Sequence, residues 1–362
     1  MKIGILTHHK VSSHGALLQM YGLQQVLQGL GHQVVILDYE RNLDFIDETT
    51  RKRFSAGLSN LSYYLRSYLV ENGPGMLLYQ YKKQKVLGGF RGQHFTQIPY
   101  VNSQELDAVV VGADEVFSLE NGVNFMMYGH GITSRHVLSY APSFGQTDVD
   151  RIRRFGCERL ISSGLEGFTA LSVRDAGSQA VIRHLLGKEA PLVCDPALLW
   201  DFGRIEKQPQ KEKYIVVYSY QSNFKEEARI AAIRAYAKKK GCRLWSVGVY
   251  YKWCDRRINC TPMEMLQIFA NAEAVITDTF HGTISSYIAR TPVAVFVREN
   301  NNVKLGYLLK QLGYEDRQVT AVEQLESVLA APPHFEEADR RVASLRKAGM
   351  SYLTEALQLC EE

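Results

Sequence analysis

The sequence predicts an α/β protein built from two doubly wound, Rossmann-like domains that face each other across a cleft. Three observations support this fold class. The chain has 362 residues, which is long for one hydrophobic core and suitable for two. Short β-rich apolar runs alternate with amphipathic segments along most of the chain, as in βαβ units. The alternation breaks once, in a polar stretch at Phe202–Lys213 that we interpret as the interdomain linker, and then starts again.

The first domain is expected over residues 1–205. Its candidate strands are Lys2–Thr7, Gln33–Tyr39, Ala108–Gly112, His136–Ala141, Ala170–Val173 and Leu192–Cys194. Helical periodicity lies between them, most clearly at Gly15–Gly29 and Asp148–Ser163. Strands and helices in this order predict a parallel sheet covered by helices on both faces.

The second domain is expected over residues 206–335 and repeats the alternation. Its candidate strands and helices are Tyr214–Tyr220, Phe224–Lys240, Arg243–Tyr250, Pro262–Ala272, Ala274–Thr277, Gly282–Ala289 and Val293–Val297. The helix at Pro262 has the clearest start, because Thr261 can cap it and Glu264 completes a capping box. Helices at residues 336–362 close the chain, and one of them can cross back onto the first domain.

The composition is that of a globular protein. Hydrophobic residues make up 46% and charged residues 22% of the chain, which excludes disordered and collagen-like classes. No apolar run approaches the ~20 residues of a membrane span and the N-terminus has no secretory signal, so we expect a cytoplasmic protein. The net charge of +4 is too small to indicate nucleic acid. The cysteines form no CxxC pair, so neither a disulfide framework nor a zinc site is expected.

Parallel sheets bind ligands at the carboxyl ends of their strands, so the loops there are the candidate site. The loop Thr277–Thr283 leads from a strand into a helix and contains His281. A helix start with unpaired N–H groups favours a phosphate, and His281 can donate a proton to that anion. The alternative is that Thr279 or Asp278 only caps the helix and that the hydrogen-bonding groups of His281 find their partners within the interface, without a ligand.

Two loops of the first domain add charged side chains. Arg174 directly follows an apolar strand, where its guanidinium suits a carboxylate or a phosphate; the alternative is an ion pair with Asp175 that organises the next helix. Asp114 and Glu115 follow the strand Ala108–Val111, so at least one carboxylate should lie at the ligand-facing edge of the sheet, where either could act as a base or bind sugar hydroxyls. The alternative for Asp114 is a cap of the next segment.

The first loop, Thr7–Gly15, contains three histidines and two serines but matches neither the GxGxxG dinucleotide fingerprint nor a phosphate loop. Neither NAD nor P-loop ATP chemistry is therefore indicated. A metal site at His8, His9 and His14 is not favoured, because no carboxylate or cysteine completes the set.

The stretch from Asn72 to Gln104 contains no acidic residue. Basic side chains occur in it among aromatic ones, at Lys82, Lys83, Lys85 and Arg91. Such a surface could contact an anionic membrane, or hold a lipid-linked acceptor at the inner face of that membrane. The favoured alternative is a pair of ordinary helices with aromatic residues in the core and lysines in water.

Taken together, the loops resemble those of the polysaccharide pyruvyl transferase family. The resemblance covers most of the chain and rests on the order and spacing of Lys2–Thr7, His14–Gln19, Val111–Phe117, Ser139–Gly145, Ser172–Asp175, Asp195–Leu199 and Thr277–Thr283. The family implies two Rossmann-like domains resembling those of B-type glycosyltransferases, with the acceptor on the first domain and the donor on the second. The implied donor is phosphoenolpyruvate, and the implied acceptor is a sugar of a cell-surface polysaccharide or its precursor. No metal or other cofactor is implied.

For a reaction of this kind, His281 is expected as the general acid or as a phosphate ligand. Asp114 or Glu115 is expected as the base, and Arg174 as an anion ligand. The remaining substrate-binding candidates are Thr279, Gly282, Thr283, His14, Gly15 and Ser143. Thr279 departs from the family, whose established pyruvyl transferases tend to carry an arginine two positions before the histidine.

Two other functions share this architecture. A B-type glycosyltransferase that uses a nucleotide sugar would also place a histidine and a helix start near a diphosphate. A non-catalytic carbohydrate-binding relative would keep the fold without turnover. Stabilisation by phosphoenolpyruvate, by nucleotide sugars, or by glycans alone distinguishes the three functions.

Overall fold

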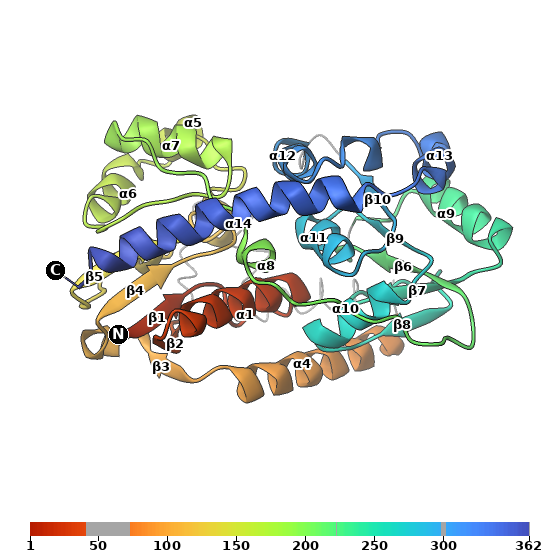
Figure 1. Cartoon of the computed structure of the whole chain (residues 1–362), viewed down its shortest axis with the longest axis horizontal. Coiled ribbons are helices and arrows are strands. Elements are labelled where there is room, and N and C mark those ends of the chain that lie inside the picture. The colour runs from red at the N-terminus through yellow and green to blue at the C-terminus, as the bar shows by residue number, and fades with distance from the viewer. Residues whose placement is uncertain (41–72, 222, 298–301, 362) are drawn as a thin grey trace.

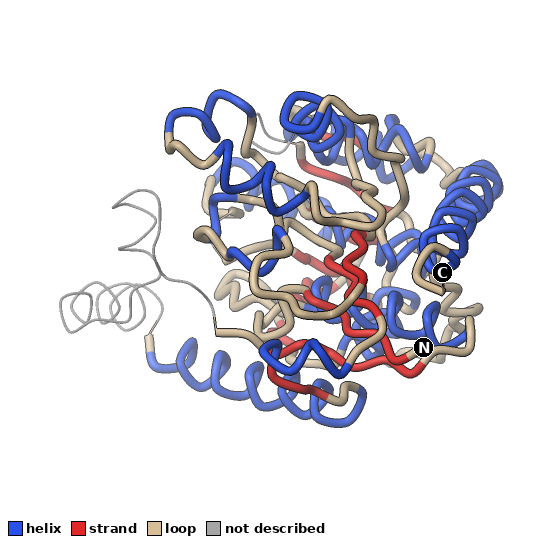
Figure 2. The backbone as a smooth tube through the Cα atoms, turned by 90° about the vertical axis from the view of Figure 1, so that its left-hand side faces the viewer, coloured by secondary structure: helices blue, strands red, loops and turns tan. Residues whose placement is uncertain are grey.

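The computed structural model describes residues 1–40, 73–221, 223–297 and 302–361. The described residues form two separate parallel sheets, one from each half of the chain. Figure 1 shows the two sheets next to one another with their helices around them. In Figure 2 the strands lie in the interior and helices surround them. The two doubly wound, Rossmann-like units expected from the sequence are therefore confirmed.

The first sheet has the strand order β3-β2-β1-β4-β5, and every pair is parallel. Its strands are β1 (Lys2–Leu6), β2 (Gln33–Asp38), β3 (Gln97–Pro99), β4 (Ala108–Val111) and β5 (His136–Ser139). Among the described residues of this half, the α-helices are α1 (His14–Gly29), α4 (Pro74–His94), α5 (Val149–Arg154), α6 (Glu158–Leu165), α7 (Ala176–Leu186) and α8 (Pro196–Leu199). The strand order reverses between β1 and β4, which is where such a sheet binds its ligand.

The second sheet has the strand order β11-β10-β9-β6-β7-β8 and is also fully parallel. Its strands are β6 (Tyr214–Tyr218), β7 (Arg243–Val247), β8 (Arg256–Ile258), β9 (Ala274–Thr277), β10 (Val293–Phe296) and β11 (Gln318–Val319). Its α-helices are α9 (Glu227–Lys239), α10 (Pro262–Ala270), α11 (Phe280–Ile288), α12 (Asn302–Leu312) and α13 (Leu325–Ala330). The order reverses between β6 and β9, which defines a second ligand-binding edge.

The C-terminal helix α14 (Phe335–Gln358) contacts both halves of the molecule. It packs on α8 of the first half and on α12 of the second, and Figure 1 shows it running along both. The Nε atom of Arg346 donates to the carbonyl of Leu198 at 2.6 Å, and the Tyr352 hydroxyl donates to the carbonyl of Ser139 at 2.8 Å. The helix therefore crosses back onto the first half. The domain boundaries at residues 205 and 335 stay a prediction.

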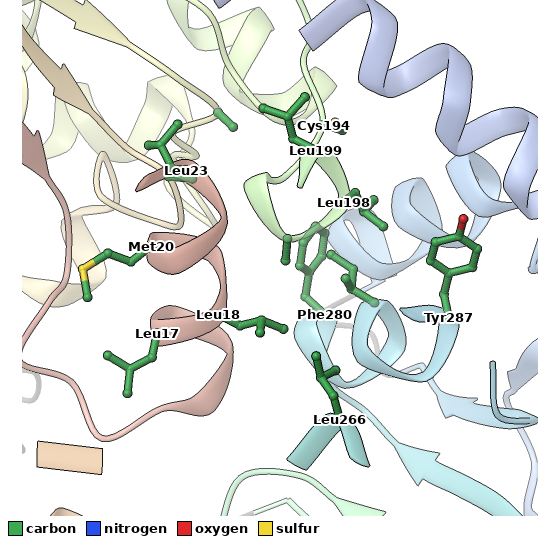
Figure 3. Packing of buried hydrophobic residues seen from close by; sticks show 14 of the residues in the cluster. Leu17, Leu18, Met20, Leu23, Cys194, Leu198, Leu199, Leu266, Phe280 and Tyr287 are labelled. Carbon is green, nitrogen blue, oxygen red and sulfur yellow. The ribbon is translucent and has the colours of Figure 1, made fainter. Parts of the chain in front are cut away.

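A hydrophobic cluster joins the two halves. In Figure 3, Leu18 of α1 points toward Leu266 of α10 and toward Phe280 of α11, and Leu198 of α8 lies on the other side of the Phe280 ring. All four side chains are at most 5% exposed. Burial of each stabilises the contact by ~1.5–3 kcal/mol. The N-terminus of α11 is thereby held against the first half of the chain.

Two expected strands are wrong. Ala170–Val173 and Leu192–Cys194 make only the isolated bridges Leu138↔Ala170 and Val173↔Leu192. Their apolar side chains, such as Val173 and Val193, are buried in the hydrophobic core without belonging to a strand. An apolar run of three or four residues reports burial, and burial alone does not establish strand pairing.

The helix expected at Asp148–Ser163 is divided into α5 and α6. Gly156 lies between them with a φ of +64°, in the left-handed region that ends a helix. The short strands β3, β8 and β11 were not expected from the sequence. They have two or three residues each and their side chains are mostly exposed or half-buried, so they lack a clear apolar pattern.

The basic residues of the stretch Asn72–Gln104 lie on one α-helix, α4, and the stretch then continues through β3 into a 3-10 helix at Tyr100–Glu105. Asn72, where the stretch begins, lies outside the described residues. Two side chains of α4 contact the second half. The Tyr79 hydroxyl donates to the carbonyl of Ile258 at 3.0 Å, and Lys83 Nζ donates to the carbonyl of Gly248 at 2.7 Å. Lys82 and Lys85 are exposed. Over the described ranges, no helix combines the length and apolar character needed to cross a membrane.

Candidate active site

Charged side chains from both halves meet where the two sheets reverse their strand order. Asp114 follows β4 of the first sheet, and His281 follows β9 of the second. Arg174 and Asp195, which are 2.7 Å apart, connect the two residues: Nη2 of Arg174 lies 3.7 Å from Oδ1 of Asp114, and Oδ2 of Asp195 lies 3.5 Å from Nε2 of His281. The loops at the two ligand-binding edges therefore share one site, which we call the interdomain site.

Asp195 is the centre of the interdomain site. Its Oδ1 atom caps α8 by accepting from the backbone N–H of Ala197 at 2.9 Å. Its Oδ2 atom accepts from Nη1 of Arg174 at 2.7 Å and lies 3.5 Å from Nε2 of His281. The Asp195 side chain is fully buried, and those of its two partners are at most 9% exposed. One carboxylate thus joins an arginine of the first half to a histidine of the second.

The pKa of Asp195 lies well below its usual range. Burial alone would raise that pKa, but the positive charges of His281 and Arg174, together with the hydrogen bond from the backbone N–H of Ala197, outweigh it. The pKa of Asp114 is lowered in the same way, because His281, Arg174 and Lys304 overcome the effect of burial. Both carboxylates are therefore ionised at neutral pH.

Arg174 is 2% exposed and has unused hydrogen-bonding capacity. Its Nη2 atom lies 3.7 Å from Oδ1 of Asp114, and its guanidinium lies 4.3 Å from the centre of the Phe280 ring. The Nε and Nη2 atoms of Arg174 and the Nε2 atom of His281 are buried, and none has a hydrogen-bond partner in the part of the chain that the structure describes. Buried polar groups nearly always have partners, so three such atoms around one carboxylate indicate a place for a further ligand.

The alternative roles for Arg174 and Asp114 do not match the contacts. Asp175 caps α7 by accepting from Ser178 N at 2.8 Å, and the closest carboxylate to Arg174 is Asp195. An Arg174–Asp175 ion pair is therefore not formed. The short turn that follows Asp114 is capped by Ser118. Asp114 keeps 23% of its side chain exposed and accepts no close hydrogen bond from the described residues, so its carboxylate is open to a substrate.

Glu115 also reaches the site but is already paired. Its Oε1 atom lies 2.6 Å from Nζ of Lys304, which belongs to α12 in the second half. Both side chains are 28% exposed. Lys304 Nζ also lies 5.8 Å from the centre of the Phe280 ring. The ion pair thus connects the two halves at the exposed side of the interdomain site.

His281 lies against the start of α1. A Cβ atom at Gly15 would lie 2.3 Å from Cγ and 2.5 Å from Nδ1 of His281, so only glycine permits this approach. The Phe280 ring lies edge-on to the His281 ring at 5.4 Å. Gly15, Phe280 and Asp195 together fix the orientation of the imidazole. The absence of a side chain at Gly15 thus makes room for His281, and the predicted contact of Gly15 with substrate stays a prediction.

Several other predicted substrate-binding side chains serve the local structure. Thr279 caps α11 by accepting from Gly282 N at 3.0 Å, and the Thr283 hydroxyl donates to the carbonyl of Thr279. A Cβ at Gly282 would collide with Thr277 and Thr279. The Ser143 hydroxyl donates to Asp175 at 2.6 Å. These groups are engaged in hydrogen bonds of the local structure, and the predicted substrate contacts of Thr279, Gly282, Thr283 and Ser143 stay a prediction.

His14 forms a hydrogen bond between the two halves. Its Nε2 atom donates to the carbonyl of Cys260 at 2.9 Å, and the residue is 1% exposed. Burial, and to a lesser degree the charge of Lys83, lower the pKa of His14 to about 3, so the imidazole is neutral. The predicted contact of His14 with substrate stays a prediction, and in this structure the side chain connects the two halves.

The sequence interpretation assigned no role to Asp195 or Lys304. Asp195 belongs to one of the motifs shared with the family, but an Asp-Pro pair before an apolar run is also an ordinary helix start. Lys304 gives no local signal, because its partner Glu115 is 189 residues away. Only the tertiary structure brings either residue to the site.

Comparison with solved structures agrees with a GT-B-like protein. A putative UDP-N-acetylglucosamine 2-epimerase from Listeria monocytogenes shares the fold with a TM-score of 0.50 at 10% identity, over 94% of this chain and 90% of that one. The UDP-GlcNAc 2-epimerase of Methanocaldococcus jannaschii gives 0.49 at 12% identity, over 96% and 100%. The glycosyltransferase SnogD of Streptomyces nogalater gives 0.46 at 15% identity, over 99% and 98%. At these identities only the fold is compared.

Sequence comparison gives the family. The profile of the polysaccharide pyruvyl transferase family matches residues 14–300, so the chain belongs to that family, as its motifs indicated. Among proteins of curated function, none matches the chain by sequence. The family implies transferase activity with a pyruvyl donor and a sugar acceptor.

Proposed function

We propose that the protein transfers a pyruvyl group from phosphoenolpyruvate to two hydroxyls of one sugar, which becomes a cyclic ketal. The sugar belongs to a cell-surface polysaccharide or to its lipid-linked precursor, and the protein acts in the cytoplasm at the inner face of the membrane. The observation that carries the proposal is the set of buried, unpartnered nitrogen atoms of Arg174 and His281 around Asp195. Family membership supports the reaction type.

Phosphoenolpyruvate fits the chemistry of these atoms. Its carboxylate and phosphate offer oxygen acceptors to nitrogen atoms that have only longer ion-pair contacts and no hydrogen bond, and a guanidinium binds either group through two parallel hydrogen bonds. Nε and Nη2 of Arg174 are neighbouring donors on one edge of the guanidinium. Asp195 holds the third nitrogen, Nη1, at 2.7 Å, so the guanidinium is fixed before the donor binds.

The reaction needs one proton donor and a base. A proton added to the methylene carbon of phosphoenolpyruvate leaves C2 electron-poor, and an acceptor hydroxyl attacks C2 while its proton passes to the base. The C2–O bond to phosphate then breaks, with its electron pair leaving on the phosphate. A second hydroxyl of the sugar attacks C2 and releases its proton. Phosphoenolpyruvate and a diol thus give a ketal and inorganic phosphate, with no net change in protons.

His281 is the proposed acid. Asp195, 3.5 Å from its Nε2 atom, stabilises the protonated imidazole, which is how a buried carboxylate supports a catalytic histidine. Asp114 is the proposed base for the first hydroxyl, because its carboxylate is ionised and partly exposed. Arg174 stabilises the negative charge of the donor throughout.

The bond that breaks can be identified with oxygen-18 in the bridging position of phosphoenolpyruvate. The protein is incubated with this donor and a panel of pyranosides whose hydroxyl pairs can close five- or six-membered ketals. Cleavage at C2 delivers the label to inorganic phosphate, whereas cleavage at phosphorus leaves it in pyruvate. We expect labelled phosphate and a ketal methyl signal, both lost in His281→Ala and kept in His334→Ala, whose side chain is 53% exposed at the surface. Label in pyruvate would contradict the proposal.

A further inference from the structure

The donor site has too little free positive charge for phosphoenolpyruvate if Arg174 acts alone. The donor carries about three negative charges at neutral pH, and burying an unpaired charge is costly. Asp195 and Asp114 lie 2.7 Å and 3.7 Å from the arginine and offset its charge. Thr279, two positions before the histidine, contributes a neutral hydroxyl that is already used as a helix cap.

A second cationic side chain, that of Lys304, lies near the Phe280 ring that Arg174 also contacts. Phe280 has the Arg174 guanidinium at 4.3 Å and Lys304 Nζ at 5.8 Å from its ring centre. The two cations come from different halves of the chain, and the ring belongs to the first turn of α11 beside His281. Lys304 also contributes to the lowered pKa of Asp114, which places its charge within reach of the proposed base.

Lys304 differs from Arg174 in being accessible. Its side chain is 28% exposed, against 2% for Arg174, and its only described ion-pair partner is Glu115 at 2.6 Å. The Glu115 carboxylate is equally exposed and packs near the backbone of Gly145, where a Cβ would lie 3.1 Å from Cδ of Glu115. A half-exposed lysine–carboxylate pair contributes little to stability, so a better anion can replace its carboxylate at small cost.

We propose that Lys304 is the second anion-binding residue of the donor site, and that the phosphate of phosphoenolpyruvate displaces Glu115 from its ammonium group. The inference rests on the proposed function, since it assigns a residue to the donor of that reaction. Displacement leaves Glu115 as a carboxylate without its cation at the exposed side of the site. Donor binding therefore prepares a second base, which suits a reaction in which two hydroxyls each lose a proton.

The competing explanation is a purely structural ion pair that holds the two halves together. The two explanations differ in the effect of removing each partner. If the pair is structural, removal of either side chain breaks the same contact and has the same effect. If Lys304 binds the donor and Glu115 competes for it, removal of the lysine weakens donor binding and removal of the carboxylate does not.

The test is calorimetric titration of phosphoenolpyruvate into the wild type and the variants Lys304→Met, Lys304→Arg and Glu115→Gln, with thermal unfolding as the check of folding. Loss of a charge-assisted hydrogen bond predicts a dissociation constant raised ~10- to 100-fold in Lys304→Met. Lys304→Arg should stay within a few-fold of the wild type. Glu115→Gln should bind as tightly as the wild type or more tightly.

Two results would overturn the inference. One is an unchanged dissociation constant in Lys304→Met. The other is equal weakening in Lys304→Met and Glu115→Gln, which is the result expected of a structural pair. If the wild type itself does not bind phosphoenolpyruvate, the proposed function fails before the role of Lys304 is reached, so the two failures are distinguishable.

Discussion

Substitution of Gly15 by alanine perturbs the interdomain site through a single added methyl group. The new Cβ would lie 2.3 Å from Cγ, 2.4 Å from Cβ and 2.5 Å from Nδ1 of His281. Carbon atoms in van der Waals contact are ~3.5–4.0 Å apart, so the two groups must separate by ~1 Å or more. His281 has little room to retreat, because it is 8% exposed and lies between Asp195 and Phe280.

The strain has two measurable consequences. Overpacking of a filled interface costs ~1–3 kcal/mol of unfolding free energy. Displacement of a catalytic group by about 1 Å reduces turnover by ~10²-fold. We therefore expect Gly15→Ala to lower both the stability in urea denaturation and the rate of phosphate release from phosphoenolpyruvate.

Gly29→Ala is the matched control for this prediction. Gly29 is the last residue of the same helix, and a Cβ there meets nothing within 4 Å in the described structure. Alanine is favoured over glycine in helices by up to ~1 kcal/mol, so this variant should be as stable as the wild type or more stable. If Gly15→Ala matched Gly29→Ala in stability and turnover, the packing of His281 against α1 would be refuted.

Three further predictions concern stability and membrane contact. Folded His14 has its pKa lowered to about 3 by burial, so between pH 6.5 and 3 the unfolded chain binds a proton that the folded chain does not. On acidification the free energy of unfolding of the wild type should therefore fall more steeply than that of His14→Gln, by ~1.4 kcal/mol per pH unit, measured by urea unfolding from pH 7 to 5. Parallel plots of this free energy against pH for the two proteins would contradict the prediction. Asp195→Asn leaves a buried arginine without its carboxylate and should lower the free energy of unfolding by ~3–5 kcal/mol. Asp201→Asn, at an exposed ion pair, should lower it by under ~1 kcal/mol. Equal losses of the two variants in denaturant titrations would contradict the buried Arg174–Asp195 ion pair. If α4 contacts a membrane, Lys82→Gln with Lys85→Gln should reduce sedimentation with anionic vesicles, most at low salt; equal binding would favour solvated lysines.

The parts of the fold with strong local signals could be predicted from the sequence. Thr261, Pro262 and Glu264 form the capping box that begins α10, as expected. Buried strands such as Ala108–Val111 were found because all of their side chains are apolar. The edge strand Arg256–Ile258 was missed, because its backbone pairs with β7 while its side chains remain in water. A strand that is held by backbone pairing alone has no alternation of apolar side chains in the sequence from which it could be predicted.

The sequence indicates individual candidate residues of the site but not the contacts between them. His281 and Arg174 each stood in a polar loop after a strand, and the structure brings both to the same carboxylate oxygen. That oxygen belongs to Asp195, whose local sequence indicates only a helix cap. Thr279 and Ser143 carry hydroxyls that the backbone around them uses. Which polar side chains stay available depends on these local bonds, and a sequence pattern does not contain them.

The central claim, that the interdomain site takes phosphoenolpyruvate, is tested most directly by ligand-dependent thermal unfolding of the wild-type protein. No acceptor has to be known for this measurement. Ligand at 100 times its dissociation constant adds ~2.7 kcal/mol to the stability of the folded state. We predict that phosphoenolpyruvate raises the melting temperature by several degrees, that nucleotide sugars do not, and that Arg174→Gln abolishes the shift. Stabilisation by nucleotide sugars without stabilisation by phosphoenolpyruvate would contradict the claim and identify a glycosyltransferase instead.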